Sequence, residues 1–268
     1  MRTCPDSGRP TVTTTGAIRG WSNGTGVTDW RTASLVEKRP ETRTAATLVF
    51  DVGGWPGHRA GQHVDLRLTA EDGYQASRSY SIASPPENGS VALTVERLED
   101  GEVSPYLVDV MQPGDELELR GPVGGWFVWE TGNQAPLLLI GGGSGVVPLM
   151  SMLRHRAARD NRTPARLLVS ARTIDDLIYG HELAELEGRE DGLELFVTLT
   201  REAPDGWDGF TRRLDRDLLA EVAWPPAEAP STYICGPTSF VETAADALVS
   251  LGHDAAAIRT ERFGPTGT

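Results

Sequence analysis

The first half of the chain alternates apolar and polar residues with a period of two. In GQHVDLRL, residues 61–68, valine and leucine alternate with histidine, aspartate and arginine. The same alternation occurs in VALTVERL (91–98) and DELELR (115–120), and the turn sequences EDG, ENG and QPGD separate such runs. Short alternating runs bounded by turn residues are typical of antiparallel strands. From Thr28 to about Glu130 the pattern predicts a small barrel or sandwich, and we expect a six-stranded antiparallel barrel.

After Pro136 the pattern changes, and short apolar runs alternate with segments of helical period. The expected strands are residues 136–140, 165–170, 193–200, 231–235 and 256–263, and the expected helices are residues 145–158, 175–186, 212–222 and 238–252. In the first helix Val147, Met150 and Leu153 fall on one face. Strands that alternate with helices in this way indicate a parallel sheet with helices on both faces. We therefore expect a five-stranded, Rossmann-like α/β domain.

The length of 268 residues favours two domains. We place the barrel domain at residues 27–131 and the α/β domain at residues 132–268. Residues 1–26 are rich in threonine, glycine, serine and proline and have no sustained apolar period, which predicts a flexible tail. Cys4 lies in this tail, and we give it no role.

Composition narrows the class of protein. Apolar residues make up 39% of the chain and charged residues 24%, as in ordinary soluble globular proteins. No apolar run approaches the roughly 20 residues that span a bilayer, and the N-terminus has no signal-peptide core, so we expect a cytoplasmic protein without membrane insertion. A net charge of −13 disfavours nucleic-acid binding. Two cysteines cannot build a disulfide framework or a four-cysteine metal site, and we expect no metal.

A glycine-rich turn joins the first strand of the second half to the following helix. Gly141, Gly142, Gly143 and Gly145 let a ligand approach the backbone, and the helix start favours an anion, most often a phosphate. The spacing matches neither the G-x-G-x-x-G fingerprint nor the P-loop, which has a lysine. A turn that is merely tight is the alternative.

The tip of the next strand carries Ser170 and Arg172. In dinucleotide-binding domains a carboxylate at this tip binds the ribose diol, whereas arginine and serine suit a 2′-phosphate. NADPH is therefore favoured and NADH stays possible, because Asp175 and Asp176 follow nearby. The alternative is that Arg172 is a solvated loop residue.

The stretch RSYSIAS, residues 78–84, places an arginine, a tyrosine and three serines on what we expect to be a buried strand. Strands that only pack a core rarely carry so much hydrogen-bonding chemistry. The period of two puts Arg78 and Tyr80 on one face. The composition of this strand points to a ligand rather than to packing alone.

Four motifs occur in a fixed order: RSYS (78–81), GGGSGVVP (141–148), CGP (235–237) before a helix, and an aromatic residue, Phe263, near the C-terminus. In this order they resemble the ferredoxin–NADP⁺ reductase superfamily of two-domain flavoproteins, over Asp29 to Gly264. The resemblance implies an FAD-binding barrel followed by an NAD(P)-binding α/β domain.

For the barrel, the resemblance implies that Arg78 binds the FAD pyrophosphate, that Tyr80 packs on the isoalloxazine ring and that Ser81 hydrogen-bonds near flavin N5. A strand and a glycine-to-serine turn add further contacts along the cofactor. The implied flavin-binding residues are Arg78, Ser79, Tyr80, Ser81, Val95, Arg97, Gly101, Val103 and Ser104. The alternative for Ser104 is a simple helix N-cap.

For the α/β domain, the resemblance surrounds the NADPH pyrophosphate with Gly142, Gly143, Ser144, Gly145 and Val146. It places Cys235, Gly236 and Pro237 beside the nicotinamide, and Phe263 over the flavin face where the nicotinamide stacks. The implied catalytic set is Ser81, Cys235, Glu261 and Phe263, with Cys235 as a neutral sulfur. The alternatives are a buried strand-end thiol for Cys235 and a core position for Phe263.

The implied activity is hydride transfer from NADPH to FAD, followed by single-electron transfer to a separate acceptor protein. The acceptor could be a ferredoxin, an oxygenase component, a haem protein or a molybdenum protein, since two cysteines cannot hold a [2Fe–2S] cluster. The arginines between residues 154 and 166 are a candidate docking surface for an acidic partner, or else a solvated helix face. Two alternatives stay open: a non-catalytic FAD electron-transfer subunit, and a flavin-free NADP-binding regulatory module.

Overall fold

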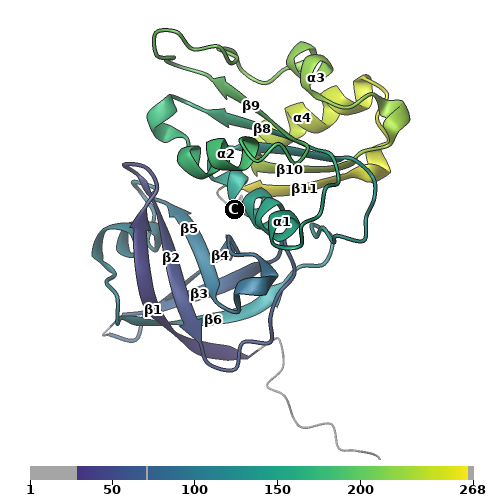
Figure 1. The fold of residues 1–268 in the computed structure, drawn as a ribbon. Coiled ribbons are helices and arrows are strands. Elements are labelled where there is room, and N and C mark those ends of the chain that lie inside the picture. Colours follow the sequence, from purple (N-terminus) through teal and green to yellow (C-terminus); the bar gives the residue numbers. More distant parts are fainter. Residues whose placement is uncertain (1–28, 71, 265–268) are drawn as a thin grey trace, which may run out of the picture.

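The computed structural model describes residues 29–70 and 72–264, which form an antiparallel sheet and a parallel sheet joined by one connecting segment (Figure 1). The predicted tail at residues 1–26, with Cys4, lies outside the described residues. Within the described ranges, no helix is long and apolar enough to cross a bilayer, and no three acidic, histidine or cysteine side chains gather into a possible metal site.

The antiparallel sheet contains six strands in the order β4-β3-β6-β1-β2-β5. They are β1 (Trp30–Pro40), β2 (Ala45–Val52), β3 (His63–Thr69), β4 (Gln75–Ser81), β5 (Val91–Glu96) and β6 (Glu116–Val123). Beyond the end of β4, Ile82 forms an antiparallel bridge with Leu93 of β5, which brings the two outer strands together as in a barrel. The six-stranded barrel expected from the alternating pattern is confirmed.

Alternation builds the barrel because successive side chains of a strand point to opposite faces. The apolar members of each run fill one interior cluster, which includes Leu35, Leu48, Phe50, Val64, Leu66, Leu93 and Leu119. Two short helical turns lie between the strands, Pro86–Asn88 and the π-helical turn Tyr106–Val110.

The second sheet is parallel and contains five strands in the order β11-β10-β7-β8-β9. The strands are β7 (Leu137–Gly142), β8 (Ala165–Ala171), β9 (Leu193–Leu199), β10 (Ser231–Pro237) and β11 (Ile258–Phe263). The helices are α1 (Val146–Ala158), α2 (Gly180–Glu187), α3 (Arg216–Val222) and α4 (Thr238–Ser250), with single 3₁₀ turns at Gly143–Gly145, Ile174–Asp176, Pro226–Glu228 and Ala255–Ala257. The expected five-stranded α/β sheet is confirmed.

The helices cover the two faces of the parallel sheet in pairs. α3 and α4 pack on the outer face, whereas α1 and α2 lie between this sheet and the barrel (Figure 1). The core on the inner face continues into the barrel half, because it includes Ala83, Ala92, Phe127 and Trp129. The two halves therefore share one continuous apolar interface around α1.

Three local expectations are corrected by the structure. Strand β4, expected to be buried, is the outer strand of its sheet and is exposed at Ser77, Arg78 and Ser79, because a strand at the edge lacks one neighbour. Helix α2 begins at Gly180 rather than near residue 175, since Tyr179 before it has a left-handed backbone, with φ 64°. Helix α3 begins at residue 216 rather than 212, because the Asp215 carboxylate accepts a hydrogen bond from the Leu218 amide and caps the helix there.

Candidate functional site

The carboxyl ends of the parallel strands meet at one edge of the second sheet. Gly142 of β7 pairs with Ser170 of β8, and Pro237 of β10 pairs with Phe263 of β11. Ligands of open α/β sheets bind at this edge. The residues expected to bind a dinucleotide are therefore gathered in one region, although they come from four separate strands.

Strand β4, an outer strand of the six-stranded sheet, carries the RSYS motif. In its register with β3, Arg78 lies opposite Leu66 and Tyr80 opposite Val64, so Arg78 and Tyr80 share the face that Leu66 and Val64 occupy. The Tyr80 ring packs against the barrel core, and burial raises the pKa of its hydroxyl to about 12. The hydroxyl therefore stays protonated at physiological pH.

Arg78 has an acidic neighbour that the motif did not reveal. Its Nη2 donates to Oε2 of Glu102 at 2.9 Å, and Glu102 Oε1 accepts a second hydrogen bond, from the Tyr74 hydroxyl at 3.0 Å. Both side chains of the Arg78–Glu102 pair are about half exposed, at 52% each. Ser79 points elsewhere, because its hydroxyl donates to Asp65 at 2.7 Å.

The glycine-to-serine turn is closed by a side chain. Ser104 Oγ accepts a hydrogen bond from the Leu98 amide at 3.0 Å, and a Cβ on Gly101 would lie 2.8 Å from that oxygen. Ser104 is therefore not the N-cap considered as an alternative; Pro105 holds that position. Ser104 and Pro105 are already helical and lead into the π-helical turn Tyr106–Val110, and because this helical run is short its dipole adds little to anion binding.

The remaining barrel residues of the expected set point in different directions. The side chain of Val95 is buried in the barrel core, so only its backbone could face a ligand. Val103 is also buried. Arg97 donates from Nε to Asp109 at 2.7 Å, which holds its guanidinium on the turn after β5.

Two glycines of the dinucleotide loop are required by close packing within the protein, whereas the sequence suggested that they make room for a ligand. A Cβ on Gly145 would overlap the Cys235 carbonyl, and a Cβ on Gly142 would lie 3.0 Å from the Phe240 ring. Gly143 is different: its φ is +55°, and the nearest atom to an added Cβ is Oε2 of Glu96, at 3.6 Å. Gly143 is therefore the position of this loop with the most room around its backbone, and its nearest neighbour is a carboxylate of the barrel strand β5.

The loop continues directly into α1. The Val146 amide already donates to the carbonyls of Gly143 and Ser144, and the Val146 side chain is fully buried. Ser144 is half-buried at the turn. No acidic residue occupies the first turn of α1, which leaves its N-terminus suited to an anion.

At the tip of β8, Ser170 is half-buried and Arg172 is exposed. Among the residues that the structure describes, the Arg172 guanidinium has no hydrogen-bond or ion-pair partner. Its backbone carbonyl is occupied, since the amide of Arg201 donates to it at 2.9 Å. Asp176 is occupied by the Thr173 hydroxyl, at 2.8 Å.

Strands β10 and β11 bring the expected catalytic residues of the second domain together. Cys235 pairs with Glu261, and the next residues on the same face, Pro237 and Phe263, pair with each other. The Cys235 side chain is fully buried, and burial together with the nearby Glu261 carboxylate raises the pKa of its thiol well above the ordinary value. The sulfur is therefore neutral, and Gly236, with φ +155°, turns the chain beside it.

The two halves of the expected catalytic set meet at His63, which sequence reasoning missed. His63 lies opposite Ser81 in the β3–β4 ladder, and its Nδ1 is 3.6 Å from Oε1 of Glu261. His63 therefore neighbours both residues across the domain interface, Ser81 through the register of the strands and Glu261 through its imidazole. The alternation of residues 61–68 indicates that His63 faces away from the barrel core, but it contains no information on the strand from the other domain.

The arginine-rich segment does not form a free basic surface. Arg154 pairs with Glu182, Arg156 with Asp191 and Arg166 with Glu194, and Arg159 lies 4.0 Å from Glu87. Arg156 is only 2% exposed. Most of this segment's charge is thus paired within the chain, which weakens the case for a docking surface for an acidic partner, and that surface stays a prediction.

Comparison with known sequences agrees with this arrangement. Residues 32–128 match the family "Oxidoreductase FAD-binding domain", and residues 139–246 match the family "Oxidoreductase NAD-binding domain". The first range covers the barrel, and the second covers the α/β half from β7 into α4 and ends before β11. FAD and a nicotinamide dinucleotide are thus confirmed as the cofactor classes of the two halves.

Two curated relatives and one solved structure are similar over most of the chain. The glycine betaine monooxygenase reductase subunit of Chromohalobacter salexigens is 35% identical over 211 residues, which cover 78% of this chain and 56% of the relative. Ferredoxin–NADP reductase B of Sorangium cellulosum is 35% identical over 76% of this chain and 85% of its own length. The FAD/NAD-binding domain of nitric oxide dioxygenase from Vibrio cholerae superposes with a TM-score of 0.79 and 27% identity, over 88% of this chain and 99% of that one.

The chain spans about half the length of the first of these curated relatives, so its likeness to that protein concerns the two domains described above. The reductase from Sorangium cellulosum, in contrast, is covered over most of its length. Together with the two family matches and the shared two-sheet architecture, these comparisons show that the chain belongs to the ferredoxin–NADP⁺ reductase family of FAD- and NAD(P)-binding oxidoreductases.

Proposed function

We propose that the chain is an FAD-dependent reductase that oxidises NADPH and delivers electrons to a separate acceptor protein. The observation that carries this proposal is the meeting of Ser81 and Glu261 at His63. Ser81 belongs to the FAD-binding half and Glu261 to the NAD-binding half, so the two cofactor-binding halves converge on one point. FAD, when bound, supplies the chemistry that links a two-electron donor to one-electron acceptors.

The residues of the barrel fit FAD. Arg78 offers a half-exposed guanidinium whose acidic partner, Glu102, is a surface carboxylate, and a surface ion pair of this kind is weak enough to exchange for a phosphate. Tyr80 presents a ring held by the barrel core on the same strand face. We assign pyrophosphate binding to Arg78 and ring stacking to Tyr80, with the turn from Gly101 to Ser104 beside them. We keep four further residues in the proposed FAD site, although their side chains are buried or paired elsewhere, because their backbone could still contact the cofactor: Ser79, Val95, Arg97 and Val103.

The residues of the second half fit a dinucleotide. The N-terminus of α1 follows the open Gly143 position, which suits a pyrophosphate. The unpartnered guanidinium of Arg172 with Ser170 at the tip of β8 suits a 2′-phosphate, which supports NADPH over NADH. The backbone of Gly142 to Val146 and the turn Cys235–Pro237 complete the proposed dinucleotide site.

The proposed reaction requires little covalent chemistry from the protein. Ser81 and Glu261 orient the reacting edge, His63 lies between them, and Cys235 supplies a neutral, polarisable surface rather than a nucleophile. Phe263 is half-buried at the end of the edge strand β11, and we assign it the role of covering the site until a nicotinamide takes its place. Alignment of the two partners is the main contribution, and it can lower a barrier by roughly 7–11 kcal/mol.

The acceptor is proposed by relationship to similar proteins. The names of the relatives include reductase components of glycine betaine and propane monooxygenases and a ferredoxin–NADP reductase. We therefore propose a ferredoxin or an oxygenase component, and keep haem and molybdenum proteins as further classes. A reducing, cytoplasmic location and a domain boundary between residues 131 and 132 are parts of the same proposal.

Anaerobic stopped-flow spectroscopy tests the proposal. The purified, FAD-loaded protein should lose its blue absorbance on mixing with NADPH, and more slowly with NADH at equal concentration. A bleached protein should then reduce a ferredoxin or an oxygenase component. A yellow protein that neither nucleotide bleaches would instead be a non-catalytic electron-transfer subunit, and a colourless protein that refuses added FAD would be a dinucleotide-binding module.

A further inference from the structure

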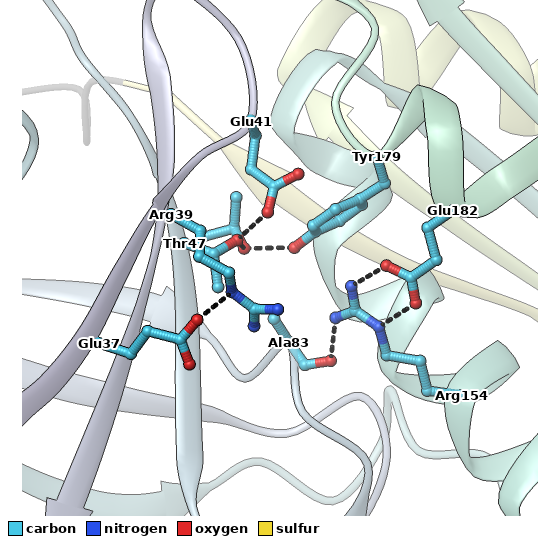
Figure 2. Close-up of polar contacts among 9 residues, drawn as sticks. Glu37, Arg39, Glu41, Thr47, Ala83, Arg154, Tyr179 and Glu182 are labelled. Carbon is cyan, nitrogen blue, oxygen red and sulfur yellow. Dashed lines mark hydrogen bonds and ion pairs between the residues drawn. The ribbon is translucent and has the colours of Figure 1, made fainter.

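A partly buried polar cluster joins the two halves beside the candidate site (Figure 2). Its members are Arg154 of α1, Tyr179 and Glu182 at the start of α2, and Ala83 and Thr94 of the barrel half; we call these five residues the interdomain polar cluster. None of the five belongs to the cofactor-binding or catalytic residues assigned above.

Arg154 is the centre of this cluster. Its Nε and Nη2 donate to the two carboxylate oxygens of Glu182 at 2.8 and 2.6 Å, and its Nη1 donates to the Ala83 carbonyl at 2.7 Å. The guanidinium carbon lies 4.5 Å from the centre of the Tyr179 ring. One planar group is thus fixed on three sides, which only an arginine can provide.

The acceptor of Arg154 lies two residues after Ser81. Helix α1 makes two further contacts with the same short segment: Ser151 Oγ donates to the Ser84 carbonyl at 2.8 Å, and His155 Nδ1 lies 2.8 Å from Glu87. The three contacting residues of α1 are spaced i, i+3 and i+4, so they form one face of the helix. The helix that begins at the dinucleotide loop is therefore held in register with the strand end that carries Ser81.

Tyr179 provides a second connection between the halves. Its hydroxyl donates to Thr94 of β5, Thr94 and Thr47 hydroxyls are 2.7 Å apart, and Thr47 donates to Glu41 at 2.6 Å. Since each hydroxyl has one proton, the chain of donors runs in a single direction, from Tyr179 to the Glu41 carboxylate. Such a chain is fully satisfied and therefore rigid.

We infer that Arg154 is a positioning residue, which sets the alignment of the dinucleotide loop relative to the Ser81 end of the flavin strand. The inference rests on the proposed function, because the alignment matters only if a reaction joins the two halves. The contacts of Arg154 are Glu182, Ala83 and Tyr179, none of which is assigned to a cofactor, so we expect each cofactor to bind its own half without Arg154. The reaction between the two cofactors does require the alignment that Arg154 provides, since a misplacement of the reacting groups by about 1 Å can lower the rate on the order of 100-fold.

The test compares Arg154→Met with Arg166→Met. Arg166 is a matched control because it also pairs with a glutamate, stacks over an aromatic ring (Trp224, 3.9 Å) and donates to backbone carbonyls, but all within the second half. For Arg154→Met we expect FAD content and NADP⁺ affinity within about twofold of wild type, and flavin reduction by NADPH slower by roughly 10- to 100-fold. Arg166→Met should reduce its flavin at the wild-type rate.

Three further measurements separate positioning from a general loss of stability. Arg154→Lys should recover part of the rate, because it restores one charged donor. The long-wavelength charge-transfer absorbance of reduced protein with NADP⁺ should be weaker in Arg154→Met than in Arg166→Met. In flavin-free protein, hydrogen exchange of the peptide covering residues 82–88 should be faster in Arg154→Met alone.

Equal rates for Arg154→Met and Arg166→Met would overturn the inference, and so would a loss of FAD from Arg154→Met in proportion to its loss of rate. If Arg154→Met does not fold, Glu182→Gln takes its place and must show the same separation of rate from binding. Failure of the proposed function itself looks different, because the wild-type protein would then not be bleached by either nucleotide.

Discussion

Arg78 of the outer strand β4 and Glu102 form a half-exposed ion pair, with Nη2 of the arginine 2.9 Å from Oε2 of the glutamate. We propose that Arg78 binds the pyrophosphate of FAD. The Glu102 carboxylate therefore pairs with the same guanidinium that the phosphate would contact. Two predictions of opposite sign follow from this one relationship.

Arg78→Ala should weaken FAD binding by roughly 10- to 100-fold, because a charge-assisted hydrogen bond to an anion is lost. The ratio of flavin to protein absorbance after purification measures the effect. Arg67→Ala is the control, since Arg67 is a nearby arginine paired at 2.7 Å with Glu118. Full flavin retention in Arg78→Ala would remove the pyrophosphate role.

Glu102→Gln should strengthen FAD binding by up to about fivefold, because it frees Arg78 and removes a negative charge next to a phosphate. Titration of FAD into the flavin-free protein, followed by fluorescence quenching, provides the affinity. Glu99→Gln, at an exposed position of the same loop, should leave it unchanged. Weaker binding in Glu102→Gln would show that the carboxylate supports the site instead of competing for it.

Arg172→Ala should raise KM for NADPH by at least about tenfold and change KM for NADH little, since the guanidinium is proposed to contact only the 2′-phosphate. Steady-state kinetics with both nucleotides measures the difference. Arg189→Ala is a suitable control, because residue 189 follows α2 at the opposite end of the strands. Equal changes for the two nucleotides would contradict the NADPH preference.

Gly145→Ala should destabilise the protein by about 1–3 kcal/mol, because the added methyl group would overlap the Cys235 carbonyl and force the loop away from β10. Gly132→Ala adds the same methyl group where no atom lies within 4 Å, and it should be close to neutral. Urea unfolding of both variants gives the comparison. A stable Gly145→Ala protein would mean that the loop can shift at little cost.

The Cys235 thiol should make stability depend on pH above its ordinary pKa of roughly 8.5. Burial raises the pKa of this thiol in the folded protein, so the folded state keeps its proton while the unfolded state releases it. This contribution is fully present below the unfolded pKa and decreases as the pH rises above it. The midpoint temperature of thermal unfolding, measured from pH 7 to 10, should therefore decrease more steeply with pH in wild type than in Cys235→Val.

The same burial predicts slow alkylation. In a Cys4→Ser background, iodoacetamide at pH 8 should modify native Cys235 far more slowly than the urea-unfolded chain, because the thiolate is the reactive form. Rapid modification of the native protein would show that the thiol is accessible and ionised.

The order of elements was predictable because local periodicity reports it directly. A period of two in residues 61–68 and a period of 3.6 in residues 145–158 were enough for the barrel strand β3 and the helix α1. Helix starts were less predictable, since they depend on single residues such as Asp215, whose carboxylate caps α3, and Tyr179, whose backbone is left-handed. A single capping residue or a single left-handed residue can set the start of a helix, whereas helix propensity is summed over many residues and does not locate that start.

The candidate site was predictable in its chemistry and only partly in its contacts. The sequence by itself determined which strand carries Arg78, Tyr80 and Ser81, because neighbours along a strand keep a fixed spacing. Only the tertiary structure decided that Glu102 pairs with Arg78, that His63 lies between Ser81 and Glu261, and that Arg154 reaches Ala83. The physical reason is distance along the chain: these partners are separated by 24 to 198 residues, and no local pattern records which loops and strands the folded core brings together.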